Sequence, residues 1–189
     1  MEIQFTEEQG RVLLQFARST LTYRLSGGKP PAPLVKPDFL RKRAVFVTLT
    51  KAGSLRGCIG NLDPVLPLWE SVRDNAVNAA IHDHRFPPLT AKELDSVTIE
   101  VSVLTQAKTL SHTGGDDLVG KLRVGVDGVV LRKDGRSATF LPQVWEQLVT
   151  PEVFLEQLCA KAGLSKETWQ SADVSIETYQ VECFSERKP

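Results

Sequence analysis

The segment Leu55-Arg56-Gly57-Cys58-Ile59-Gly60 places a guanidinium group and a thiol two residues apart and contains two glycines. Residues 44–50, just before it, alternate in polarity and favour a strand, so a short turn and the segment itself complete a hairpin. Apolar residues then recur at helical spacing over 68–81. Glycine beside a thiol is typical of a backbone that closely approaches a ligand or that adopts an unusual φ angle. The sequence therefore predicts a hairpin that leads into a helix, with Cys58 on the second arm.

The rest of the chain mixes helical and β-rich patterns without a sustained βαβ order, which favours an α+β fold with mainly antiparallel sheets. We expect one domain spanning residues 1–189, built as two intertwined lobes. The proline-rich segment 26–38 is the expected crossover between them. Further helices are expected at 7–25, after Thr90, and from Pro151 to Gly163, further strands at 97–104 and 175–184, and a β-meander within 116–141.

The charges balance, with 23 basic and 23 acidic residues. This balance argues against a dedicated nucleic-acid binder, because phosphate neutralisation supplies most of that affinity. One stretch of the chain is locally basic: it contains Lys36, Arg41, Lys42 and Arg43, and its one acidic residue is Asp38. Such a run is typical of a solvated rim, and it can also receive an acidic partner or an anionic ligand.

The chain has three cysteines and no CxxC pair, a pattern that fits a reducing compartment. We recognise no signal peptide and no apolar run of membrane-spanning length. We therefore expect a cytoplasmic protein that does not contact a membrane.

Two interpretations of Cys58 stay open. In one, Cys58 is a nucleophile or a soft ligand, and the charge of Arg56 favours its thiolate and anchors an anionic group. The base would be His82, His84 or His112. In the other, Cys58 ends a buried strand and Arg56 pairs with a buried carboxylate.

Other polar residues are candidates to line the same site. Asn75, on the predicted helix, can bond a loop backbone or face a ligand. Glu100 and Ser102 should share the outward face of their strand, where Glu100 is solvated or pairs with Arg56. Residues 82–84 resemble metal ligands beside Cys58, but ligand type alone does not make a site. We expect no metal and no cofactor.

Several blocks of residues occur in order along the chain: the segment 55–60, Asp83-x-Arg85-Phe86-Pro87-Pro88-Leu89, Asp127-Gly128-Val129-Val130-Leu131, and Leu141-Pro142-Gln143-Val144. Together they resemble a known family, the AMMECR-type domain, named AmmeMemoRadiSam system protein A in bacteria and archaea. Family members typically have proline where His84 stands, and His82 has no match, which counts against the metal interpretation. Asp83 more simply turns the chain, and Arg85 makes an ion pair.

The resemblance implies a larger and a smaller lobe. It also implies two partners, a Memo-like protein related to extradiol dioxygenases and a radical S-adenosylmethionine (SAM) protein. The primary hypothesis is an accessory component that acts with them. The alternatives are a small enzyme that uses Cys58 and Arg56, and, less favoured, a nucleic-acid or nucleotide binder. The candidate binding residues are Leu55, Gly57, Ile59, Gly60, Asn75, Asp83, Arg85, Phe86, Glu100 and Ser102.

Overall fold

A computed structural model describes residues 5–186, which divide into two compact units. Unit 1 contains the described residues up to 105 and those from 182, and unit 2 contains residues 106–181. The chain therefore passes between the units near residues 105 and 181. The proline-rich segment 26–38 lies within unit 1, so the expectation of a crossover there is wrong. None of the described helices is long and apolar enough to cross a membrane.

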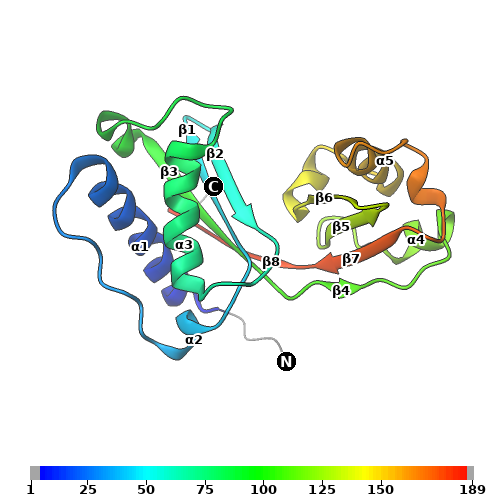
Figure 1. Cartoon of the computed structure of the whole chain (residues 1–189), viewed down its shortest axis with the longest axis horizontal. Coiled ribbons are helices and arrows are strands. Elements are labelled where there is room, and N and C mark those ends of the chain that lie inside the picture. The colour runs from blue at the N-terminus through cyan, green and yellow to red at the C-terminus, as the bar shows by residue number, and fades with distance from the viewer. Residues whose placement is uncertain (1–4, 187–189) are drawn as a thin grey trace. The chain divides into compact units, whose positions relative to one another are not determined.

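Unit 1 is built on a four-stranded sheet in the order β2-β1-β3-β8 (Figure 1). Its strands are β1 (Val45–Lys51), β2 (Ser54–Asn61), β3 (Val97–Leu104) and β8 (Val181–Ser185). β1 pairs antiparallel with both β2 and β3, which confirms the predicted hairpin. β2 lies at one edge of the sheet, so among residues 5–186 no strand pairs with the outer side of the segment 55–60.

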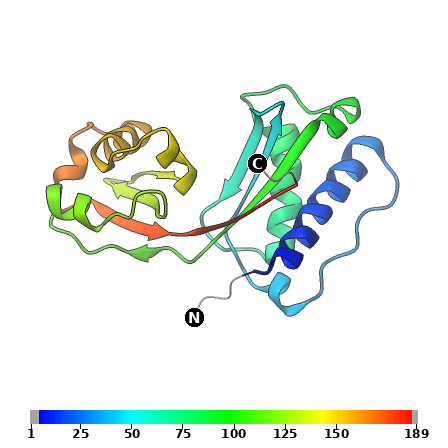
Figure 2. The same ribbon diagram turned by 180° about the vertical axis from the view of Figure 1, so that it is seen from behind.

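Helices α1 (Glu7–Ser26) and α3 (Leu68–Val77) pack against each other and against this sheet (Figures 1 and 2). A capping box between Thr6 and Gln9 starts α1 and satisfies backbone N–H groups of its first turn. α3 continues into a π-helical turn, Asn78–His82, and a 3₁₀ turn, Ala91–Ser96, precedes β3. Short helix α2 (Pro37–Leu40) inserts Phe39 into the same core.

Strand alternation decides which side chains enter the core of unit 1. Val45, Val47 and Leu49 of β1 are fully buried in the cluster that includes residues of α1 and α3. In the register with β2, Val47 lies opposite Ile59, and Thr48 lies opposite Cys58. Because successive residues of a strand point to opposite faces, Cys58 and Thr48 lie on the face that those helices leave uncovered.

Unit 2 has its own four-stranded sheet in the order β4-β7-β5-β6 and its own core. The indole of Trp145 stacks on the ring of Phe154 within that core, at 3.8 Å between centroids. Its elements are β4 (Lys108–Thr109), α4 (Gly115–Lys121), β5 (Gly128–Lys133), β6 (Arg136–Phe140), a 3₁₀ turn (Pro142–Glu146), α5 (Pro151–Lys161), a 3₁₀ turn (Thr168–Gln170) and β7 (Ser175–Tyr179).

The α+β fold with antiparallel sheets is confirmed, with two local differences from the prediction. The expected meander over 116–141 is wrong in its first part, where α4 forms, and right at the β5–β6 hairpin. The single strand expected at 175–184 is divided into β7 and β8, which belong to different sheets. Residues 175–184 contain no Gly, Pro, Asn or Asp, so no turn signal in the sequence marks the division.

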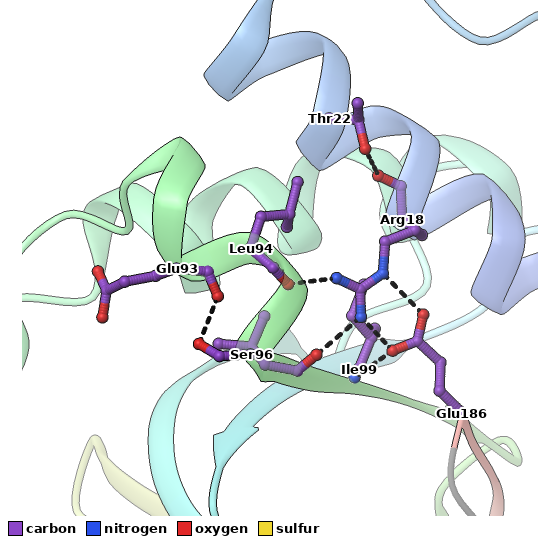
Figure 3. Close-up of polar contacts among 8 residues, drawn as sticks. Arg18, Thr22, Glu93, Leu94, Ser96, Ile99 and Glu186 are labelled. Carbon is purple, nitrogen blue, oxygen red and sulfur yellow. Dashed lines mark hydrogen bonds and ion pairs between the residues drawn. The ribbon is translucent and has the colours of Figure 1, made fainter.

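Arg18 on α1 holds the end of the described chain against unit 1 (Figure 3). Its guanidinium donates to the carbonyl of Leu94 at 2.6 Å and to that of Val97 at 2.8 Å. It also donates from two nitrogens to the carboxylate of Glu186, which in turn accepts from the backbone N–H of Ile99 at 2.8 Å. One arginine therefore joins α1, the 3₁₀ turn before β3, the first residue of β3 and the residue after β8.

We predict that Arg18→Ala lowers the free energy of unfolding by about 2 kcal/mol, because it leaves the Glu186 carboxylate and two carbonyls without their donor. Amide hydrogen exchange in β8 should accelerate more than exchange in β1. Arg11→Ala, an exposed arginine on the same helix, is the matched control and should change stability by less than about 0.5 kcal/mol. Equal effects of the two substitutions would contradict the role given to Arg18.

Candidate functional site

The backbone of Cys58 is paired at the open edge of β2 by two side chains instead of a strand. Its N–H donates to Asp83 Oδ2 at 2.9 Å, and its carbonyl accepts from Arg85 Nη2 at 3.1 Å. An edge strand presents unpaired backbone groups, and each buried one requires a partner. Asp83 and Arg85 supply an acceptor and a donor side by side, as the residue of a neighbouring strand would.

Asp83 and Arg85 are themselves joined by a two-point ion pair. Arg85 Nε donates to Oδ1 at 2.9 Å and Arg85 Nη2 to Oδ2 at 2.7 Å. The side chain of Asp83 is only 2% exposed. The hydrogen bond from Arg85 holds the pKa of Asp83 far below its usual range; burial opposes this shift, and the Cys58 N–H adds to it. The same pairing raises the pKa of Arg85.

The end of α3 brings Asp83 to this position. The helix widens into the π-helical turn, and Asp83 is the first residue after it. A Cβ atom at Gly57 would lie 2.1 Å from the carbonyl oxygen of Ala79 in that turn. Only glycine allows this approach, so Gly57 is needed for close packing between β2 and the helix end.

The thiol of Cys58 is half-buried and lies on the face of the sheet that carries Thr48. Thr48 Oγ1 donates to Cys58 Sγ at 3.3 Å. Glu100 lies opposite Thr48 on the next strand, so the register forms a row of thiol, hydroxyl and carboxylate. Positions two strands apart are separated by about 10 Å, which puts Glu100 beyond direct reach of the sulfur.

Arg56 pairs with Glu93, so the suggested pairing with Glu100 is wrong. Arg56 Nη2 lies 3.2 Å from Glu93 Oε2, and Lys51 Nζ lies 3.0 Å from Oε1. Lys51 and then Arg56 lower the pKa of Glu93 to about 2. The register shifts between Leu49 and Thr50, which leaves Arg56 without a partner in β1. This irregularity gives Arg56 and Cys58 different surroundings, although they are two residues apart.

The polar side chains of Asn75 and Ser102 form contacts within unit 1. Asn75 Nδ2 donates to the carbonyl of Val45 and to Asn61 Oδ1, both at 2.9 Å. Ser102 was expected on the outward face, yet it is 1% exposed. Its hydroxyl lies 3.5 Å from Glu100 Oε1, at the limit of a hydrogen bond. Asn75 and Ser102 therefore do not present free polar groups to a ligand.

The other members of the predicted set have mixed surroundings. Leu55 is exposed, whereas Ile59 packs against the core of unit 1. A Cβ atom at Gly60 would overlap the Phe46 ring. The guanidinium of Arg85 lies over the ring of Phe86, 5.5 Å from its centroid.

The histidines do not gather around the thiol. His82 and His84 are exposed, and His112 lies in unit 2, where Nε2 is 2.9 Å from the carbonyl oxygen of Val174. Within residues 5–186, no group of three or more His, Cys, Asp or Glu side chains is placed to hold a metal ion.

Thr48, Glu93 and Ala79 contact the candidate site, and the sequence analysis did not assign them to it. Thr48 follows from the hairpin register once the turn is known. Glu93 was recognised only as the partner of Thr90 in a capping box, which the structure confirms. Ala79 acts through its backbone, so its side chain gave no signal.

The fold and this edge site define an α+β protein with a half-buried cysteine on an edge strand, whose backbone is bonded by Asp83 and Arg85. Residues 14–184 match the AMMECR1 family model. A protein of Methanothermobacter thermautotrophicus is 38% identical over 96% of each chain, and one of Methanosarcina acetivorans is 36% identical over 97% of this chain and 94% of its own. The crystal structure of an uncharacterized Pyrococcus horikoshii protein is similar, with a TM-score of 0.88 and 33% identity over 99% of this chain and 96% of that one. The chain belongs to the AMMECR1 family.

We predict that Asp83→Ala lowers the free energy of unfolding by about 3 kcal/mol, because it leaves the Cys58 N–H unsatisfied and Arg85 unpaired. Asp83→Asn keeps an acceptor for the N–H and loses the charge, so its cost should be roughly half as large. Asp74→Ala removes an exposed carboxylate that pairs with Arg73 and serves as the control, with an effect below about 1 kcal/mol. Chemical denaturation measures all three.

The pH dependence separates the ion pair from general packing. Since the pKa of Asp83 is lowered by folding, its contribution is present above the unfolded-state pKa of about 4 and is lost as the pH falls below it. The stability difference between wild type and Asp83→Asn should stay constant from about pH 8 to about pH 5 and shrink below about pH 4. A difference that persists unchanged at low pH would contradict the ion-pair explanation.

Proposed function

We propose that the protein is an accessory component that acts through contacts with other proteins, namely the Memo-like protein and the radical SAM protein that the family resemblance implies. The observation that carries this proposal is that the polar groups around the segment 55–60 are already bonded to one another. Arg56 is paired with Glu93, and the Cys58 backbone with Asp83 and Arg85. A substrate site needs polar groups that converge on a ligand, whereas a docking surface needs rigidity and exposed apolar area. The three cysteines, all present as thiols, fit the cytoplasmic location that we propose with it.

Leu55 is the most direct candidate for a contact with a partner. Its side chain is 44% exposed at the start of β2, next to Arg56. The backbone around it is fixed by the hairpin with β1. An exposed leucine on a rigid edge strand can be buried against another protein at little entropic cost.

We predict that Leu55→Ser weakens co-purification with the Memo-like protein of the same organism by at least about fivefold, because burial of a leucine contributes about 1–2 kcal/mol. Val149→Ser, an exposed aliphatic residue of unit 2, is the matched control and should leave binding unchanged. Pull-down from co-expressing cells, with the unfolding temperature of each variant as a check on folding, is the measurement. Full capture by Leu55→Ser would count against this surface, and the absence of capture by the wild type would count against the partner itself.

A second candidate function is a small enzyme that uses Cys58 as a nucleophile or a soft ligand. The observation in its favour is the hydrogen bond that the Thr48 hydroxyl donates to the half-buried sulfur. This bond fixes the orientation of the sulfur, and a nucleophilic cysteine reacts as its thiolate. Arg56 is a less direct participant than its place in the sequence suggests, because Glu93 occupies its guanidinium.

If Cys58 is activated, iodoacetamide at neutral pH should label it at least about tenfold faster than Cys183, which is exposed, and Thr48→Val should remove that advantage. Burial raises the pKa of Cys159, which should react last. Peptide mapping by mass spectrometry gives the three rates. Labelling of Cys58 no faster than Cys183 would exclude the nucleophile.

A further inference from the structure

Four cations surround the short helix α2 without an ionic partner in the described chain. Lys36 precedes the helix and Arg41 follows it, with Lys42 and Arg43 next. Within residues 5–186, none of their side chains forms a salt bridge, and the one carboxylate of the stretch, Asp38, accepts a hydrogen bond from Gln9 Nε2 at 2.7 Å. Since the chain as a whole is neutral, this is a local excess of positive charge.

The backbone that carries these cations is anchored. Phe39 is buried in the core of unit 1. The carbonyl of Arg41 accepts the N–H of Leu68 at 2.8 Å, and Lys42 forms an isolated bridge with Pro67. The start of α3 therefore lies beside the stretch, as Figures 1 and 2 show for α2 and α3. An anchored backbone keeps the cations in place, which lowers the entropic cost of binding.

Exposed aliphatic side chains occur in the same two segments. Val35 is 75% exposed and Val65 is 61% exposed, and Leu40 and Leu66 are exposed as well. Single exposed apolar residues are ordinary. Here Val35 and Leu40 each precede a basic residue, and Val65 and Leu66 lie on the segment beside them, so aliphatic and basic side chains occur together. We refer to the α2 surface as Val35, Lys36, Leu40, Arg41, Lys42, Arg43, Val65 and Leu66.

We propose that the α2 surface docks an acidic segment of a partner protein that carries aliphatic residues between its carboxylates. The charge of the four cations calls for an anionic partner, and the aliphatic side chains call for apolar groups on the same partner. This inference extends the proposed function, because an accessory protein acts through its docking surfaces, and it uses residues distinct from Leu55.

Two other anionic partners fit this surface less well. A nucleic acid would be served by the cations alone, and single-stranded forms favour aromatic stacking, whereas the exposed apolar residues of the α2 surface are all aliphatic. An anionic membrane favours exposed Trp, Tyr or Phe at its interface, and the phenylalanine of this segment is buried.

The test uses the full chain and a panel of synthetic fluorescent peptides of one length, in which the numbers of glutamates and of leucines vary independently. Affinity, measured by anisotropy, should rise with both numbers and fall with added salt. Arg41→Glu combined with Lys42→Glu should weaken binding of the best peptide at least about tenfold. Lys92→Glu combined with Lys166→Glu, which changes the net charge equally at exposed sites elsewhere, should weaken it less than about twofold.

Val65→Ser combined with Leu66→Ser tests the apolar part and should remove the dependence on leucine number while the dependence on glutamate number remains. Duplex DNA, single-stranded RNA and vesicles rich in anionic lipid are measured in parallel. Binding that follows charge alone, stronger binding to a nucleic acid or to vesicles, or no binding to any peptide would overturn the proposal. Each of these outcomes leaves the result for Leu55 and the Memo-like protein unaffected, so the two proposals fail separately.

Discussion

The candidate site depends on the ion pair between Asp83 and Arg85. β2 is an edge strand, and no strand in the described part of the chain pairs with the outer side of the Cys58 backbone. The carboxylate accepts the N–H, and the guanidinium donates to the carbonyl. Asp83 requires Arg85, because a nearly buried carboxylate without its cation is an uncompensated charge. The pair also closes the edge at this residue against extension by another chain.

The position of Asp83 beside Cys58 also depends on Gly57. Asp83 reaches Cys58 only because the π-helical turn that precedes it lies against β2, and the space between them has no room for a Cβ atom at residue 57. A larger residue would move the helix end away, and Asp83 with it. The glycine of the segment 55–60 and the aspartate 25 residues after Cys58 are therefore coupled through one contact. This coupling gives a physical reason for both residues to occur together.

Local signals in the sequence predicted most elements of the fold. The capping boxes at Thr6 and Thr90 and the proline that starts α5 all mark helix starts in the structure. The errors arose where tertiary pairing decides. The division between β7 and β8 has no local sign, because no Gly, Pro, Asn or Asp interrupts residues 175–184.

In the candidate site, too, the residues that the sequence could not place are those whose partners depend on tertiary pairing. The resemblance singled out Asp83 and Arg85 as matching residues, but only the structure shows that both bond to the backbone of Cys58. The partner of Arg56 could not be derived from the sequence. A register irregularity in the hairpin sets the surroundings of Arg56, and its presence depends on turn geometry that periodicity does not encode. Glu93 had a sufficient local explanation as a capping residue, so nothing in the sequence pointed to its ion pairs with Lys51 and Arg56.

The described residues place no general base beside the Cys58 sulfur. A nucleophilic cysteine needs a base, and among residues 5–186 the sulfur has a hydrogen bond only with the Thr48 hydroxyl. Glu93, with its pKa lowered to about 2, is a weak base, and its oxygens are bonded to Lys51 and Arg56. Glu100 lies two strands away. A catalytic Cys58 would therefore take its base from a bound substrate or from a second protein, and in either case the base would have to reach the sulfur on this face of unit 1.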